Sequence, residues 1–244
     1  MEKTFYDSTP FEYGYSSKEK ILENMNPNLK KVIEKSEGKI ITDIGCGCGR
    51  NLIYASKYAS KLIGVDLSKQ SLEFAKNFIQ SDNLELVLGN NLEIPLDSDF
   101  SDLVVSDGVV HHTGDTVGAF KECVRVLKPN GLLYLAVYKK YRYYPFLYKY
   151  VGAFLRILNK TKVGNFIMEN TFVLLHFLMY RIFRKQKLSL KETRNIFYDY
   201  FITPLATFQS KKDVQVWIDN NNCSLEKYDR TNGNCHVFII KKGE

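Results

Sequence analysis

Short apolar runs alternate with amphipathic stretches through the first half of the chain. Five runs rich in β-branched residues predict strands at 39–44, 61–66, 84–89, 101–107 and 131–138. Between them, apolar residues recur every three or four positions and predict helices at about 50–58, 68–80 and 115–127, with Ser68 as a helix N-cap. Strands and helices that alternate over short turns predict an α/β fold with a doubly wound, parallel sheet.

The last part of the chain extends this pattern. Two further strands at 223–231 and 235–241 meet at Asn232-Gly233-Asn234, which predicts an antiparallel hairpin and gives a mostly parallel, seven-stranded sheet. Between the fifth strand and a helix at 211–220, residues 139–210 are too many for a structureless loop. Their apolar stripes with basic flanks predict an inserted helical segment, here named the cap, for substrate binding or dimerisation.

The segment before the first strand, residues 1–36, combines aromatic residues with a helical pattern. The aromatics, among them Tyr13, form a flap over the cofactor or pack the helix onto the sheet. We therefore divide the chain into a helical or flap segment at 1–36, a cofactor-binding domain at 37–138 and 211–244, and the cap at 139–210.

Glycines at alternate positions follow the first predicted strand. Gly45, Gly47 and Gly49 give G-x-G-x-G, whereas dinucleotide-binding loops need G-x-G-x-x-G, whose third glycine would fall at Arg50. A pyrophosphate is therefore not the favoured ligand. Asp66 ends the second strand, where its carboxylate can accept hydrogen bonds from two ribose hydroxyls at the carboxyl edge of the sheet.

At this point the chain resembles the class I S-adenosylmethionine-dependent methyltransferases, within the methyltransferase type 11 group. The resemblance covers about residues 38–138 and rests on DIGCGCG at 43–49, GVDLS at 64–68, GNNLEIPL at 89–96, DLVVS at 102–106, His111-His112 and RVLKPNGLL at 125–133. Asn90 and Asn130 depart from the usual acidic residue and glycine. Asn90 can still form a hydrogen bond with an adenine edge, and Asn130 can still adopt a turn conformation.

The resemblance implies a Rossmann-like fold and S-adenosylmethionine as the cofactor, with S-adenosylhomocysteine as the product. The implied cofactor-binding residues are Asp43, Gly45, Cys46, Gly47, Gly49, Asp66, Leu67, Asn90, Asn91, Leu92 and Ser106. Some have a plain structural alternative: Asp43 as a helix cap, Leu67 as core, Asn90 and Asn91 as turn residues.

Candidate substrate-binding residues lie after the fourth and fifth strands and in the cap: Tyr13, Asp107, His111, Tyr138, Tyr198 and Tyr200. His111 is the candidate general base that deprotonates a hydroxyl or amine, while His112 equally suits a structural role in the loop. The cap tyrosines can wall an aromatic or apolar acceptor, or form the cap's own core.

Composition limits the domain organisation and the cellular location that the chain can have. With 244 residues and 45% hydrophobic content, the chain can form one large α/β domain with an insertion. The five cysteines show no C-x-x-C spacing, which disfavours zinc and disulfides and predicts a reducing, cytoplasmic location without a metal. No signal-peptide pattern is found, and the apolar stretch at 172–180 is too short to span a bilayer.

The net charge of +7 is unevenly distributed. Residues 139–212 contain 15 Lys and Arg against three acidic residues, a balance of +12, and the remainder carries −5. The favoured reading is methyl transfer to an oxygen or nitrogen of a small aromatic or apolar acceptor. The alternatives are a tRNA or RNA methyltransferase that uses the basic cap, and a membrane-surface enzyme acting on a lipid or quinone. A homodimer through the cap is also open.

Overall fold

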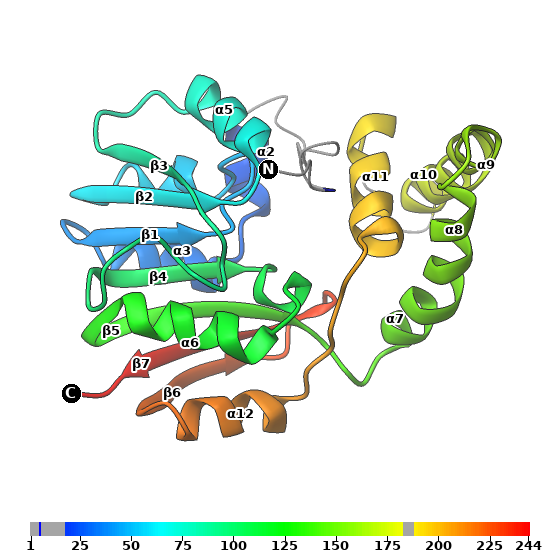
Figure 1. Cartoon of the computed structure of the whole chain (residues 1–244). Coiled ribbons are helices and arrows are strands. Elements are labelled where there is room, and N and C mark those ends of the chain that lie inside the picture. Colours follow the sequence, from blue (N-terminus) through cyan, green and yellow to red (C-terminus); the bar gives the residue numbers. More distant parts are fainter. Residues whose placement is uncertain (1–4, 6–17, 183–187) are drawn as a thin grey trace.

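A seven-stranded sheet forms the centre of the protein. The structure is a computed structural model and describes residues 5, 18–182 and 188–244. The strand order is β3-β2-β1-β4-β5-β7-β6, in which β7 runs antiparallel to both of its neighbours and the other pairs are parallel (Figure 1). The strands are β1 (Ile40–Ile44), β2 (Lys61–Asp66), β3 (Leu84–Leu88), β4 (Ser101–Asp107), β5 (Leu127–Tyr138), β6 (Cys223–Asp229) and β7 (Cys235–Lys242). The predicted doubly wound, mostly parallel sheet is confirmed.

Helices cover both faces of the sheet, and the central strands β1, β2, β4 and β5 are accordingly buried on both sides. On one face lie α2 (Lys18–Asn24), α3 (Pro27–Glu34), α4 (Leu52–Ala55) and α5 (Lys69–Phe78), and their core includes Leu29, Leu52 and Val105. On the other face lie α6 (Thr116–Val126) and α12 (Lys211–Asp219), with Phe120 and Ile218 fully buried. Ser68 caps α5, as predicted, by accepting a hydrogen bond from the Ser71 backbone N–H.

Two elements differ from their predicted bounds by more than two residues. The helix expected at 50–58 is only α4, flanked by turns. The fifth strand begins at Leu127 instead of residue 131, since Ser101 pairs with Leu127 and Leu103 already pairs with Leu132. The residues between form a bulge in which Asn130 has a φ of 63°, so a turn sequence is accommodated inside the strand.

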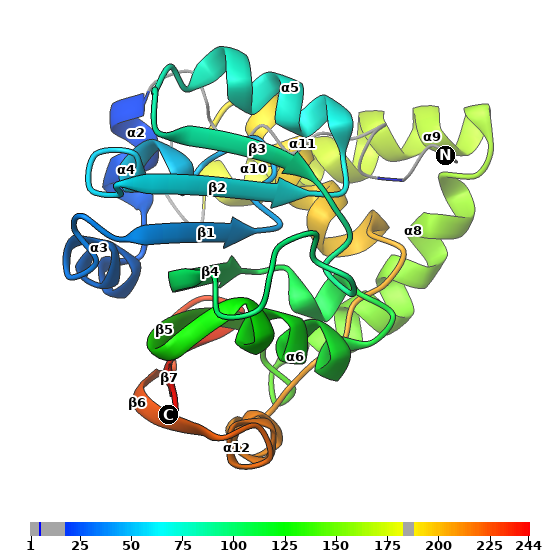
Figure 2. The ribbon, with the colours of Figure 1, turned by 60° about the vertical axis from the view of Figure 1, so that its left-hand side comes forward.

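The cap is helical and lies beyond the carboxyl ends of the parallel strands. Figure 2 shows the arrowheads of β1 and β2 pointing toward the side on which α8 lies. The cap consists of α7 (Tyr143–Phe146), η2 (Leu147–Gly152), α8 (Ala153–Leu158), α9 (Lys162–Ile167), η3 (Met168–Val173), α10 (Leu174–Ile182), α11 (Leu190–Phe197) and η4 (Tyr198–Ile202). Of these, η2, η3 and η4 are single π-helical turns. A small core around Leu155, Met168 and Phe197 holds them together, and Phe5 packs against it.

Tyr13, the predicted substrate residue of the first segment, lies outside the described residues. Within 18–36 the segment is helical, as α2 and α3. Among the described residues no helix has the length and apolar character needed to cross a lipid bilayer.

Candidate active site

A cavity of about 600 Å³ opens at the carboxyl ends of β1, β2 and β4, between the sheet and the cap. In Figure 1, α11 is the cap helix that lies nearest these strand ends. The glycine loop and Asp66 line one part of the cavity. The other part is lined by the loop after β4, the end of β5, and cap residues Ile196, Asp199 and Tyr200. Residues far apart in sequence therefore meet at one site.

The glycine loop needs its glycines for two different reasons. Gly45, Gly47 and Gly49 all have positive φ angles, of 71°, 52° and 89°. A Cβ on Gly45 would lie 2.3 Å from Val109 Cγ1, and one on Gly49 would lie 2.5 Å from Ile79 Cδ1, so these two are required by packing. A Cβ on Gly47 would meet nothing within 4 Å. Because Gly47 lines the cavity, it leaves room for a ligand to approach the backbone.

Asp66 binds this loop with its side chain. Its Oδ2 accepts a hydrogen bond of 2.7 Å from the Gly47 N–H, and its Oδ1 accepts one of 2.8 Å from the Ser68 N–H. Each carboxylate oxygen has a second lone pair, so the group can still accept from the hydroxyls of a ribose. Asp66 lines the cavity, where it can hold both the loop and the ligand.

Leu67, Asn90, Asn91 and Leu92 line the cavity beside Asp66. The Asn90 Oδ1 accepts from the Leu92 N–H, which makes it a turn residue with its amide N–H groups still available. The buried Asn91 Oδ1 has no hydrogen-bond partner among the described residues. An orphaned acceptor, an apolar Leu67 surface and the Asp66 carboxylate fit the adenine and ribose of the expected cofactor.

Charges concentrate near the glycine loop. Arg50 Nη2 lies 2.6 Å from Asp107 Oδ2, and both residues line the cavity. Asp43 is buried behind the loop and does not line the cavity, a position that suits orientation of the loop and not direct contact with the cofactor. Burial raises the pKa of Asp43 to about 8, and repulsion from Asp107 adds to this, while Arg50 acts in the opposite direction.

Ser106 and Cys46, also predicted cofactor residues, have different positions. Ser106 does not line the cavity, because alternation along β4 turns its side chain toward α6, beside the buried Cys123. Cys46 does line it, and burial holds the pKa of its thiol well above the usual range, so it is a neutral lining residue. The described residues contain no group of three or more His, Cys, Asp and Glu side chains suited to a metal ion.

His111, the predicted general base, and its neighbour His112 have different surroundings. His111 is fully buried and stacks on Tyr138, with ring centroids 3.9 Å apart, and it does not line the cavity. Burial, followed by the neighbouring His112, lowers its pKa well below 6.5. His111 therefore has no access to the cavity, and His112 is the better placed of the two histidines to act as a base.

His112 faces the cavity instead. Its Nδ1 lies 2.7 Å from the Leu205 carbonyl oxygen, which can only accept, so Nδ1 carries the proton and Nε2 presents a lone pair. Nε2 lies 3.9 Å from Asp199 Oδ1. Burial lowers the pKa of His112, an effect that Asp199 and the Leu205 carbonyl oppose. A neutral imidazole that presents a lone pair beside a carboxylate has the arrangement of a general base.

The cap supplies the wall opposite the glycine loop. The Tyr138 hydroxyl donates to Asp199 Oδ2 over 3.3 Å, and Tyr200 lines the cavity near them. Tyr198 is turned away from the cavity, and its hydroxyl donates to Glu169 Oε1, so the structure gives no support to its predicted contact with substrate. Tyr138, Asp107 and Tyr200, by contrast, line the cavity, and their contact with substrate stays a prediction.

Sequence reasoning missed several lining residues. Asn234 and Cys235 come from the β6–β7 hairpin, which β5–β7 pairing brings beside Tyr138. Asp199 and His112 also line the cavity, although the sequence analysis does not assign either of them to the site. The two terminal hairpin residues carry no local signal for this position, because strand pairing and not local sequence places them there.

Comparison with known proteins agrees with this geometry. Residues 42–135 match a family model described as a methyltransferase domain. Similar curated proteins include the uncharacterized methyltransferase YcgJ of Bacillus subtilis, 30% identical over 112 residues (45% of this chain and 44% of the relative). A ubiquinone biosynthesis O-methyltransferase of Coxiella burnetii is 29% identical over 154 residues (61% of this chain and 65% of the relative). The matches thus span less than two thirds of these relatives' lengths.

Among solved structures, a SAM-dependent methyltransferase from Aquifex aeolicus superposes with a TM-score of 0.54 at 16% identity, over 92% of this chain and 98% of the other. At that identity the likeness speaks for the fold, which it matches over nearly the full length of both chains.

Proposed function

We propose that this chain, in which residues 42–135 form a class I S-adenosylmethionine-dependent methyltransferase domain, methylates an oxygen or nitrogen of a small aromatic or apolar molecule. The observation that carries the proposal is the arrangement of the cavity. It has a ribose-binding carboxylate and an open glycine loop in one part, and a histidine–aspartate pair among aromatic side chains in the other.

The cofactor site uses the glycine loop, Asp66, and the part of the cavity lined by Leu67 and Asn91. Bound there, S-adenosylmethionine supplies an electrophilic methyl group on a sulfonium with its own leaving group. The protein then has to hold the acceptor in line and exclude water. Gly47 allows close approach to the loop, and Asp66 keeps that loop in position through the Gly47 N–H.

His112 accepts the proton of the acceptor hydroxyl or amine at Nε2. The Leu205 carbonyl fixes the tautomer, and Asp199 stabilises the imidazolium that forms. Tyr138 holds Asp199 through its hydroxyl and, with Tyr200, gives an aromatic surface for the acceptor. The Coxiella relative's name supports oxygen as the acceptor atom.

The test is to incubate the protein and a cell extract with methyl-labelled S-adenosylmethionine, then separate small molecules, lipids, RNA and protein. We expect label among small molecules in the wild type and at least a hundredfold less with His112→Gln, since general-base assistance contributes about 10²- to 10⁴-fold. His176→Gln, which changes a cap histidine outside the cavity, is the matched control. Label confined to RNA or protein would refute the proposal.

The pH profile gives an independent check. The base works in its neutral form, so activity is present above the lowered pKa of His112 and falls as the pH drops through it, below about 6.5. His112→Gln should abolish this acid limb of kcat/KM. An unchanged acid limb in the variant would assign proton uptake to another group.

A further inference from the structure

Large apolar side chains are exposed on the outside of the cap in unusual density. Val163 is 71% exposed, Phe166 69% and Ile157 65%. The set, here named the outer apolar face, consists of Phe146, Tyr150, Phe154, Ile157, Val163, Phe166, Ile167, Leu174, Leu175, Leu178, Met179 and Ile182. Large apolar side chains exposed in such numbers over one segment of the chain are typical of an interaction site.

The spacing of these residues shows that whole helix stripes point outward. From α7 through α8, Phe146, Tyr150, Phe154 and Ile157 follow one another at intervals of four, four and three residues. On α10, Leu174, Leu178 and Ile182 are four residues apart, and Tyr180 is the buried side chain of that helix. An amphipathic helix ordinarily buries its apolar stripe in the core. Here α8 gives Leu155 and the half-buried Leu158 to the small cap core, and among the described residues α9 and α10 give none.

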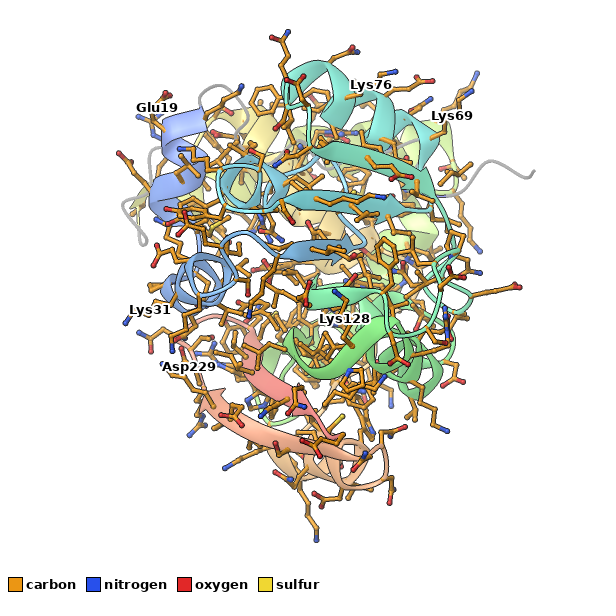
Figure 3. The ribbon with its side chains drawn as sticks, turned by 90° about the vertical axis from the view of Figure 1, so that its left-hand side faces the viewer. Glu19, Lys31, Lys69, Lys76, Lys128 and Asp229 are labelled. Carbon is orange, nitrogen blue, oxygen red and sulfur yellow. The ribbon has the colours of Figure 1, made fainter. Side chains whose placement is uncertain are left out.

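The charges on the cap have one sign at the surface. In the described part of the cap, 139–182 and 188–210, every exposed charged side chain is a cation: Lys140, Arg142, Lys149, Lys160, Lys162, Arg181 and Lys191. The three acids there are buried or half-buried, and each has a partner: Glu169 with Arg194, Glu192 with the Ser189 N–H, and Asp199 with Tyr138. By contrast, the side of the molecule turned away from the cap shows acids and lysines together (Figure 3).

Exposed apolar side chains together with exposed cations distinguish three candidate partners of the outer apolar face. A symmetric dimer through the same face would bring the cations of both copies together, at an electrostatic cost. RNA would use the cations but not aliphatic side chains such as Ile157, Leu175 and Ile182. An anionic bilayer uses both, because its acyl chains receive the apolar stripe and its headgroups receive Lys and Arg.

We propose that the cap docks on the surface of an anionic lipid bilayer through its outer apolar face. Phe154, Phe166 and Leu175 enter the boundary between headgroups and acyl chains, while Lys149 and Lys162 contact lipid phosphates. Tyr150, which has Lys149 over its ring at 5.5 Å, is suited to headgroup depth. The proposal concerns this surface and does not depend on the methyl-transfer reaction.

The test is co-sedimentation of the purified full-length chain with vesicles, read as a partition coefficient without any activity assay. Vesicles of phosphatidylcholine with about 30% phosphatidylglycerol should bind the protein, pure phosphatidylcholine much less, and about 0.5 M salt should weaken binding. Lys149→Gln with Lys162→Gln should lower the coefficient about 25-fold, at about fivefold per charge. Ile157→Asp should lower it at least tenfold.

Matched controls come from helices outside the cap. Val216→Asp changes an exposed apolar residue of α12, and Lys76→Gln an exposed lysine of α5; both should bind vesicles like the wild type. Thermal unfolding verifies that each variant is folded. Equal binding by Ile157→Asp and the wild type overturns the proposal. Binding that is equally strong with and without phosphatidylglycerol also overturns it. A wild-type dimer that Ile157→Asp converts to a monomer does so as well, because the face would then be a dimer interface.

Discussion

Replacing Asp66 with asparagine separates the two roles of its carboxylate, which holds the glycine loop and faces the ribose site. The variant keeps one acceptor oxygen but places an NH₂ group where the second oxygen accepts either the Gly47 or the Ser68 N–H. One of these donors then loses its acceptor, which costs about 1–3 kcal/mol of folding free energy. For a chain of this size the melting temperature should fall by about 2–10 °C.

Cofactor affinity should fall further. A hydrogen bond from a ribose hydroxyl to a carboxylate is worth about 1.5–3 kcal/mol, so loss of one such bond raises Kd about 10- to 150-fold. Calorimetric titration with S-adenosylhomocysteine measures this, and Asp82→Asn, at an exposed position, is the control. A variant with a lowered melting temperature and a Kd within threefold of the wild type would show that Asp66 only holds the loop, and the ribose assignment would be refuted.

Two further predictions concern the same loop. Asp43 has an ordinary pKa of 3.8 and a pKa of about 8 in the folded state, so its contribution to stability is complete below pH 3.8 and is lost as the pH rises through about 8. Asp43→Asn cannot ionise, and urea unfolding should show it gaining stability relative to the wild type between about pH 5 and pH 9; a pH-independent difference would contradict the raised pKa. Gly47→Ala should lose about 1–2 kcal/mol of folding free energy because of its positive φ, and should also lose cofactor affinity. Gly45→Ala, whose new Cβ would clash with Val109, should have a lower melting temperature than Gly47→Ala. Full cofactor affinity in Gly47→Ala would show that the ligand does not approach this backbone.

The sheet and the glycine loop could be predicted because their signals are local. Apolar runs, a helix cap at Ser68 and turn glycines determine backbone conformation over a few residues, and the positive φ angles of Gly45, Gly47 and Gly49 agree with that expectation. The bulge around Asn130 was missed because a turn sequence there is absorbed by pairing between β4 and β5. Strand pairing is a long-range property that no short window contains.

Side-chain direction at the acceptor end could not be predicted for a related reason. His111 and His112 are adjacent, and the 3₁₀ turn η1 (Val110–His112) decides which one is buried against Tyr138. Similarly, Tyr198 and Tyr200 are two residues apart in the helical turn η4 and so point to opposite sides of it. The sequence does not tell which side faces the cavity: Tyr198 points to Glu169, and Tyr200 to the cavity.

The distribution of charge in the cavity links these observations. Asp66 and Asp107 face the cavity near the glycine loop with a single guanidinium, that of Arg50, while Asp43 is buried behind them. The mutual repulsion that helps to raise the pKa of Asp43 is relieved by a cation at this end of the cavity. A sulfonium cofactor carries such a charge and its demethylated product does not. In the proposed site, these carboxylates should therefore favour the cofactor over its product, and proton uptake from the acceptor is assigned to the His112–Asp199 pair at the other end.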